Sequence, residues 1–109
     1  TLLGRGSMCI NTAGEKVFPE EVEEALKSHS SVQDCLVVGI PDEKFGEKVV
    51  ALASCSDEEF SEPELIEHCR SRIAGYKLPK NVMLVDKVAR APNGKADYKW
   101  AKQRALELL

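Results

Sequence analysis

The sequence predicts an α+β fold, in which a small antiparallel or mixed sheet of about three strands plus an N-terminal hairpin packs with about three helices. The prediction depends on three observations. Two β-branched apolar runs, at residues 32–40 and 49–53, are typical of strands covered on both faces. Segments before and after them place apolar residues at helical spacing. The connection between the two runs is too short for a parallel crossover, so we expect these strands to pair antiparallel.

The N-terminal part predicts a hairpin followed by a helix. Residues 7–17 indicate two short strands around Ala13-Gly14, where the glycine supplies the backbone freedom of a tight turn. Pro19 suits the first position of a helix that we expect to end near Ser28. The glutamates of its first turns are Glu20, Glu21, Glu23 and Glu24. We interpret this acidic run as a solvated helix face near the positive end of the helix dipole.

The C-terminal half predicts two more helices and one more strand. Ser61 and Glu64 have the spacing of a capping box, which marks the start of the second helix. Residues 81–85 predict a third strand, and residues 97–109 predict a closing helix. A polar turn region joins the last two elements.

Composition limits the functions that are open to the chain. Its 109 residues suit one domain, residues 1–109, and its 43% hydrophobic and 30% charged residues suit a modest core. A net charge of -3 argues against nucleic-acid binding. No apolar run approaches the length of a transmembrane segment. Because the chain opens at Thr1 without a methionine, we expect it to be part of a longer protein.

The cysteines and histidines predict no metal site. The cysteines are Cys9, Cys35, Cys55 and Cys69, and they lie far apart without a CxxC or CxxH pair. We therefore expect free buried thiols, which are typical of a cytoplasmic protein. His29 and His68 fall on separate expected helices without an obvious partner, so we interpret them as ordinary surface or boundary residues.

Lys95 is the candidate that the local sequence offers. It follows residues 92–94, whose Pro-Asn-Gly sequence predicts a tight exposed turn. A lysine is a compact charge on a long stem, suited to reach a phosphate or a carboxylate in another domain. A P-loop is excluded because Ala89 stands where its first glycine is required. On position alone, Lys95 is an ordinary solvated lysine. The same interpretation applies to Arg5, Lys16 and Lys77.

Four blocks of sequence, taken together, add a family resemblance. The blocks are residues 4–23, residues 38–47, Tyr76-Lys77-Leu78-Pro79 and Asn93-Gly94-Lys95. In their order and spacing they resemble the C-terminal lid domain of acyl-CoA synthetases (fatty-acid-CoA ligases) of the adenylate-forming, AMP-binding superfamily. Residues 14–19 (GEKVFP) and 94–101 (GKADYKWA) are most similar to actinobacterial, mycobacterial-type fatty-acyl or sterol-acid ligases.

The resemblance implies an ATP-dependent ligase that forms an acyl-adenylate and then acyl-CoA from a fatty or sterol-type acid. ATP, Mg²⁺ and coenzyme A would serve the full-length enzyme, and we expect none of them bound to this domain alone. A large N-terminal adenylation domain, absent here, would hold most of the substrates. The lid would rotate about a hinge at Ser7, where the family commonly has Asp or Lys. The isolated domain should be inactive.

The resemblance also assigns roles to individual residues. Lys95 would be the catalytic cation that contacts the reacting carboxylate and phosphate oxygens during adenylation. Gly14 and Glu15 would lie beside the pantetheine arm of coenzyme A during thioester formation. Arg5 and Lys16 would bind the nucleotide. All five lie at positions that match the family's motifs.

Two alternatives remain open at this point. The chain is also compatible with the lid of another adenylating enzyme, such as an aryl-CoA ligase or a peptide-synthetase adenylation domain, whose partner is a carrier protein. A non-catalytic binding module that retains the fold is the other alternative, although the presence of Gly14 together with Gly94-Lys95 speaks against it. A large upstream domain with a glycine- and Ser/Thr-rich phosphate loop would distinguish an enzyme from such a module.

Overall fold

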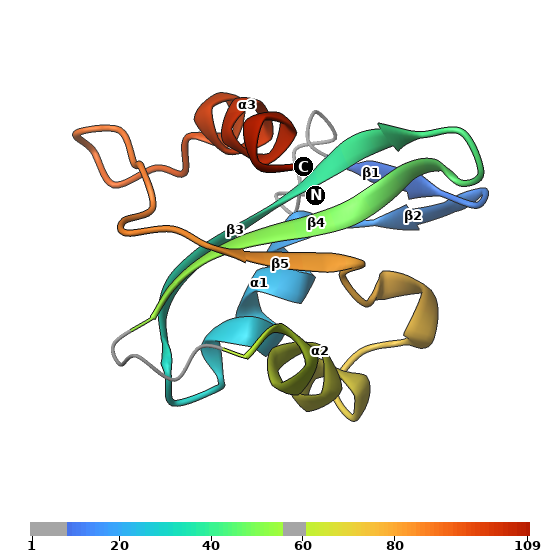
Figure 1. The fold of residues 1–109 in the computed structure, drawn as a ribbon, viewed down its shortest axis with the longest axis horizontal. Coiled ribbons are helices and arrows are strands. Elements are labelled where there is room, and N and C mark those ends of the chain that lie inside the picture. Colours follow the sequence, from blue (N-terminus) through green and yellow to red (C-terminus); the bar gives the residue numbers. More distant parts are fainter. Residues whose placement is uncertain (1–8, 56–60) are drawn as a thin grey trace.

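The computed structural model describes residues 9–55 and 61–109 and confirms the α+β prediction. Within these residues, a mixed sheet lies between α3 on one face and α1 and α2 on the other (Figure 1). The strands are β1 (Ile10–Thr12), β2 (Glu15–Val17), β3 (Val32–Asp42), β4 (Gly46–Cys55) and β5 (Asn81–Leu84). The helices are α1 (Pro19–Lys27), α2 (Glu62–Arg70) and α3 (Tyr98–Leu108), with a short 3₁₀ helix at Gly75–Lys77.

β4 is the centre of the sheet. It pairs antiparallel with β3 along their whole length, which confirms the predicted pairing. Its other edge pairs with β5 in parallel and, at Gly46, with Thr12 of β1. β2 extends the sheet beyond β1 as the second strand of the predicted hairpin. The parallel β4–β5 pair makes the sheet mixed.

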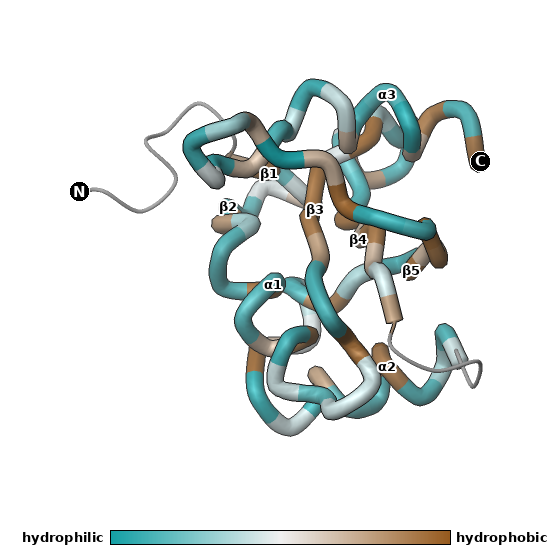
Figure 2. Tube along the Cα trace, turned by 90° about the vertical axis from the view of Figure 1, so that its left-hand side faces the viewer, coloured by the Kyte–Doolittle hydropathy of each residue, from teal (hydrophilic) through white to brown (hydrophobic). Residues whose placement is uncertain are grey.

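The strand alternation divides the core into two parts. Leu36, Val38 and Leu52 face α3, whereas Val37 and Ala51 face α1 and α2. Successive side chains of a strand point to opposite faces, so continuous apolar runs are required where both faces are covered. Figure 2 shows the apolar stretches of β3 and β4 between the helices. Among the described residues, no helix is long and apolar enough to cross a membrane.

The helix boundaries follow local signals. α1 begins at Pro19, as predicted, and ends within one residue of the expected boundary. At the start of α2, the hydroxyl of Ser61 accepts a hydrogen bond from the amide of Glu64 at 3.3 Å. At the start of α3, the carboxylate of Asp97 accepts one from the amide of Trp100 at 3.0 Å. Both are side-chain caps that satisfy an amide of the first helical turn.

Candidate functional site

Lys95 stands on a small hairpin turn between β5 and α3. The Gly94 amide donates to the Ala91 carbonyl at 2.8 Å, and the Ala91 amide donates to the Lys95 carbonyl at 2.9 Å. Gly94 has a φ of 85°, the left-handed conformation that follows a type I turn in a three-residue hairpin loop. The Asn93 side chain accepts a hydrogen bond from the Lys95 amide at 3.1 Å. The turn therefore presents an exposed Lys95 side chain.

Gly14 lies in the turn that joins β1 and β2. Ala13 and Gly14 have φ values of 53° and 83°, which identifies a two-residue type I′ turn. The Ala13 amide donates to the Phe45 carbonyl at 2.8 Å, so the turn is fixed against the β3–β4 connection. A Cβ placed on Gly14 would meet no atom of the described residues within 4 Å. Glu15 and Lys16 continue from this open position as exposed residues of β2.

The two turns lie at opposite ends of the β3–β4 ribbon. The Lys95 turn is joined through Arg90 to Asp34, near the start of β3, whereas the β1–β2 turn bonds to Phe45, beyond its end. A strand rises about 3.3 Å per residue, so β3 separates the two sites by roughly 25 Å. Figure 1 shows the loop before α3 and the β1–β2 turn on opposite sides of the molecule. The structure does not bring Lys95 and Gly14 together.

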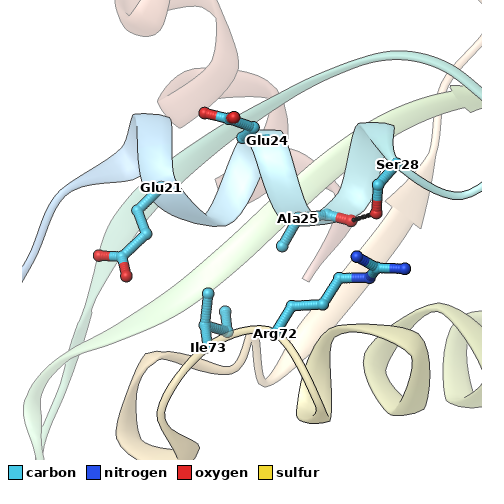
Figure 3. A pocket seen from close by; sticks show the side chains of 6 residues that line it. All are labelled: Glu21, Glu24, Ala25, Ser28, Arg72 and Ile73. Carbon is cyan, nitrogen blue, oxygen red and sulfur yellow. Dashed lines mark hydrogen bonds between the residues drawn. The ribbon is translucent and has the colours of Figure 1, made fainter.

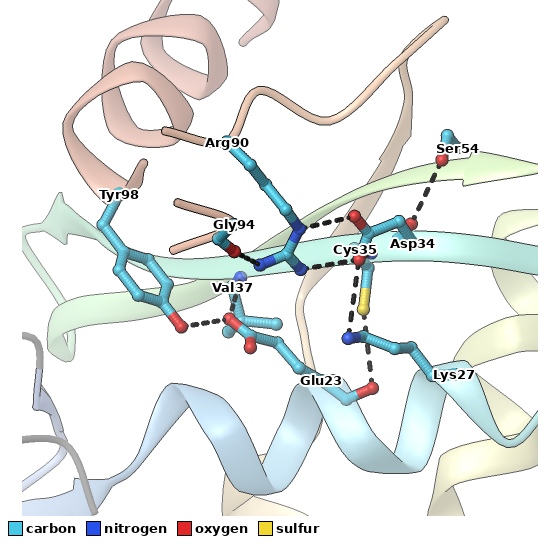
Figure 4. A network of polar contacts seen from close by, with 9 residues as sticks. All are labelled: Glu23, Lys27, Asp34, Cys35, Val37, Ser54, Arg90, Gly94 and Tyr98. Carbon is cyan, nitrogen blue, oxygen red and sulfur yellow. Dashed lines mark hydrogen bonds and ion pairs between the residues drawn. The ribbon is translucent and has the colours of Figure 1, made fainter. Parts of the chain in front are cut away.

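A polar network covers the outer edge of β3 (Figure 4). Within the described sheet β3 pairs only with β4, so some of its amides face away from the ladder. The Val37 amide and the Tyr98 hydroxyl both donate to Oε2 of Glu23, at 3.0 and 2.7 Å. Glu23 is 7% exposed, and burial raises the pKa of its carboxyl. The prediction of a solvated acidic face is therefore wrong at Glu23, because its side chain is buried against the outer edge of β3.

The same network reaches the Lys95 turn. Arg90 donates from Nε and Nη2 to the two carboxylate oxygens of Asp34, each at 2.7 Å. Its Nη1 donates to the Gly94 carbonyl at 3.3 Å. Lys27 Nζ lies 3.5 Å from the same carboxylate. The hydrogen bonds from Arg90 hold the pKa of Asp34 below its usual range, so the pair is ionised at neutral pH.

Comparison with known proteins decides the family. Residues 21–95 match the family model described as AMP-binding enzyme C-terminal domain. The chain belongs to this family. The resemblance that the four sequence blocks predicted is thereby confirmed.

The relatives of this AMP-binding C-terminal domain are CoA ligases by name. It is 56% identical to the 3-oxocholest-4-en-26-oate–CoA ligase of Rhodococcus rhodochrous, over 95% of this chain and 19% of the relative. It is 52% identical to a medium/long-chain-fatty-acid–CoA/3-oxocholest-4-en-26-oate–CoA ligase of Mycobacterium tuberculosis strain H37Rv, with the same two coverages. The chain thus spans about one-fifth of the length of these relatives.

Solved structures share the fold. A fatty acyl CoA synthetase of Mycobacterium tuberculosis superposes with a TM-score of 0.87 at 34% identity, over 93% of this chain and 20% of that chain. ATP-bound MatB of Rhodopseudomonas palustris superposes with a TM-score of 0.89 at 27% identity, over 97% of this chain and 21% of that chain. In both, the AMP-binding C-terminal domain is a small part of a longer protein.

The other predicted basic residues have different surroundings. Lys77, in the third sequence block, donates to both carboxylate oxygens of Glu21 on α1, each at 2.9 Å. This hydrogen bonding raises the pKa of Lys77 and gives the residue a structural role between α1 and the 3₁₀ helix. Lys16 is exposed on β2, close in sequence to Gly14. Arg5 and the expected hinge Ser7 lie outside the described residues.

The histidines have partners that no sequence pattern indicated, and their partial burial agrees with the interpretation as surface or boundary residues. The rings of His29 and His68 make an edge-to-face contact with centroids 4.9 Å apart. His68 Nε2 lies 2.7 Å from the Ser28 hydroxyl, which itself donates to the Ala25 carbonyl and therefore accepts from the histidine. His29 Nε2 lies 2.9 Å from Glu64. These contacts join α1 to α2, and their role is structural.

An open pocket of about 370 Å³ lies beside this contact (Figure 3). Its lining residues are Glu21, Glu24, Ala25, Ser28, Arg72 and Ile73. Arg72 extends below α1, while Glu21 is held by Lys77. None of the candidate residues that the sequence predicted lines this pocket.

The buried thiols of Cys35 and Cys69 show no sign of reactivity. Cys9, Cys35 and Cys69 are free, as predicted, and Cys55 is half-buried at the end of β4. Burial raises the pKa of Cys69 to about 11 and raises the pKa of Cys35 further, so both thiols are protonated at neutral pH. In the part of the chain that the structure describes, no group of three or more His, Cys, Asp or Glu side chains could hold a metal ion.

Sequence reasoning missed the residues that support the Lys95 turn. Arg90 and Tyr98 lie close to Lys95 in sequence, and that proximity was the available signal. Their partners Asp34 and Glu23 are 56 and 75 residues away, respectively. No local pattern connects residues at such separations.

Proposed function

We propose that this chain is the lid domain of an ATP-dependent acyl-CoA ligase and serves two half-reactions with two different turns. The observation that carries the proposal is the separation of Lys95 from Gly14 by the length of β3. One active site can receive only one of these turns at a time. A rigid-body rotation of the lid about a hinge, which we assign to Ser7, exchanges them.

In the first half-reaction, a carboxylate oxygen of the acid attacks the α-phosphorus of ATP, and pyrophosphate leaves. Two anions must approach each other, so a cation held between them lowers the barrier. Lys95 supplies this cation. Its exposed side chain on a tight turn supports the role, because it is free to enter a site on another domain.

In the second half-reaction, the sulfur of coenzyme A attacks the acyl carbon of the adenylate, and AMP leaves. The β1–β2 turn then lies beside the pantetheine arm, with Gly14 and Glu15 in contact with it. The open space around Gly14 supports this role, because a glycine backbone can approach a ligand without a Cβ in between. Lys16 and Arg5 bind the nucleotide.

The acid is a fatty or sterol-type carboxylic acid, in line with the names of the relatives at 56% and 52% identity. The acid and MgATP are held mainly by an N-terminal adenylation domain of the same polypeptide. Its existence is supported by the relatives, in which this domain is about 19% of the length. The free thiols of Cys35 and Cys69 support a cytoplasmic location.

The role of Lys95 is tested in the full-length protein with Lys95→Ala. We expect adenylation, measured as acid-dependent pyrophosphate release with a panel of fatty and sterol-type acids, to fall by about 10²–10³-fold. Thioester formation from a supplied acyl-adenylate should persist. Lys87→Ala removes another exposed lysine from the same connection and is the matched control. An equal loss in both half-reactions would contradict the assignment.

The role of Gly14 is tested with Gly14→Leu. We expect thioester formation to be blocked and adenylation to persist, because a bulky side chain would occupy the space of the pantetheine arm. Gly14→Ala places the same strain on the turn with little bulk, so it separates strain from obstruction. Equal damage from Ala and Leu would reject obstruction as the cause.

A further inference from the structure

The Lys95 turn has little packing of its own to hold it. Residues 91–95 are all exposed, and the turn closes on itself through short hydrogen bonds and an isolated bridge between Arg90 and Ala96. An exposed hairpin of this size is at best marginally stable without further contacts. Its orientation must therefore come from groups that connect it to the body of the domain.

Arg90 provides that connection at the start of the turn. Its guanidinium contacts Asp34 with two nitrogens, at 2.7 Å each, and the Gly94 carbonyl with the third, at 3.3 Å (Figure 4). A planar guanidinium fixes direction as well as distance, because its donors form a rigid fork. Gly94 immediately precedes Lys95, so this contact fixes the orientation of the peptide group that joins the two residues.

Asp34 makes Arg90 a structural group rather than a second free cation. The side chains of Arg90 and Asp34 are only 29% and 28% exposed, and the carboxylate accepts from both Nε and Nη2 of the guanidinium. The backbone that carries Asp34 is rigid, because Asp34 belongs to β3 and β3 pairs along its length with β4. At the other end of the turn, Tyr98 bonds to Glu23 at 2.7 Å.

We propose that Arg90, oriented by Asp34, is a positioning residue for Lys95: it holds the turn at a fixed angle to the sheet, so that rotation of the whole domain delivers the ammonium to one place. This inference depends on the proposed function. Misplacement of a reacting group by about 1 Å can cost about 10²-fold in rate. Loss of Arg90 should therefore impair adenylation, the half-reaction that uses Lys95, and leave thioester formation intact.

The test uses Arg90→Met and Asp34→Asn in the full-length protein, with both half-reactions measured separately. We expect kcat for adenylation to fall by about 10–10²-fold, with little change in KM for ATP. The reason is that the misplaced Lys95 ammonium would lose a contact that it makes in the transition state. Arg90→Lys keeps the charge but not the fork, so its adenylation should also stay below that of the parent. Arg70→Met removes an exposed ion pair with Glu67 and is the matched control.

A double variant and a fold measurement separate positioning from general damage. In a Lys95→Ala background, Arg90→Met should cause no further loss, because the group that it positions is already gone. Retained thioester formation, together with a cooperative unfolding transition well above the assay temperature, would exclude misfolding. If Arg90→Met lowered both half-reactions together, or if Arg90→Lys restored full adenylation, the positioning role would be overturned.

The outcome is distinguishable from failure of the proposed function. If Lys95→Ala left adenylation intact, the role of Lys95 would be rejected, and with it the basis of the inference. If Lys95→Ala impaired adenylation and Arg90→Met did not, only the positioning role of Arg90 would be rejected.

Discussion

Glu23 is the group whose replacement most directly tests the account of the β3 edge. Its carboxylate is buried and ionisable, yet it accepts two hydrogen bonds through a single oxygen, Oε2. Glu23→Gln keeps a carbonyl oxygen that can accept from both the Val37 amide and the Tyr98 hydroxyl. It removes the negative charge whose burial raises the pKa of the carboxyl. The change therefore separates the hydrogen bonds from the charge.

The expected magnitude follows from these two contributions. Burial raises the pKa of the Glu23 carboxyl, so removal of its charge by Glu23→Gln should increase the free energy of unfolding at pH 7. Glu23→Ala leaves the Val37 amide and the Tyr98 hydroxyl without their acceptor, at about 1–3 kcal/mol each. Relief of the buried charge offsets part of that loss, and we expect a net destabilisation of about 2 kcal/mol.

The pH dependence of stability gives an independent test of the sign of the Glu23→Gln effect. Because the folded pKa of Glu23 lies above its unfolded value, ionisation disfavours the folded state. The advantage of Gln should be absent below the unfolded pKa of about 4.3, grow as the pH rises toward the folded pKa, and stay constant above it. Urea unfolding followed by the fluorescence of Trp100, the single tryptophan, measures these differences.

The matched control is Glu24→Gln, which removes the same charge one residue along α1 from an exposed position. Its effect should stay within about 0.5 kcal/mol. Our account would be refuted if Glu23→Gln were less stable than the parent at pH 7, or if its advantage did not change between pH 4 and pH 8.

Two further predictions concern the two turns. Ala13 adopts a φ of 53°, which costs a non-glycine residue about 1–2 kcal/mol. Asparagine tolerates this conformation better, so Ala13→Asn should stabilise the chain by up to about 1 kcal/mol in urea unfolding. A loss of stability would contradict the backbone strain at Ala13. Arg90 lowers the pKa of Asp34, so the stability that the ionised carboxylate contributes is complete above the unfolded pKa of about 3.9 and is lost as the pH falls below it. Asp34→Asn should be less stable than the parent at pH 7 and should lose less stability between pH 5 and pH 2; parallel acid titrations of the two proteins would disprove this.

The sequence predicted the helices and strands better than the contacts between them. The apolar runs that became β3 and β4, the proline of α1 and the Ser61 cap act through neighbours in the chain, so each could be read locally. The partner of β5 could not be predicted in this way, because the same sequence pattern fits pairing with several strand edges. Only packing selects the parallel pairing with β4. Glu23 was misjudged for a related reason: helical position alone does not distinguish a carboxylate in solvent from one that bonds to a strand 14 residues away.

The site was predictable to a similar extent. Motif order selected Lys95 and Gly14, and their turns have the backbone conformations that Gly94 and Gly14 allow. What motif order could not supply was the distance between them or the means by which each is held. Arg90 and Tyr98 lie close to Lys95 in the sequence, but their importance depends on partners that only the fold brings close.

The glycine of the second motif block, Gly39, shows how the other end of the ribbon is held. A Cβ at this position would lie 2.9 Å from Ile10 Cγ2 and 3.1 Å from the carboxylate of Glu47, so glycine lets these two side chains approach β3 closely. Glu47 in turn accepts a hydrogen bond from the Asn11 amide at 2.9 Å. The Gly14 turn is therefore fixed to the same pair of strands, β3 and β4, as the Lys95 turn. Under the proposed function, neither turn can move far alone, and the change of half-reaction must come from rotation of the domain as one body.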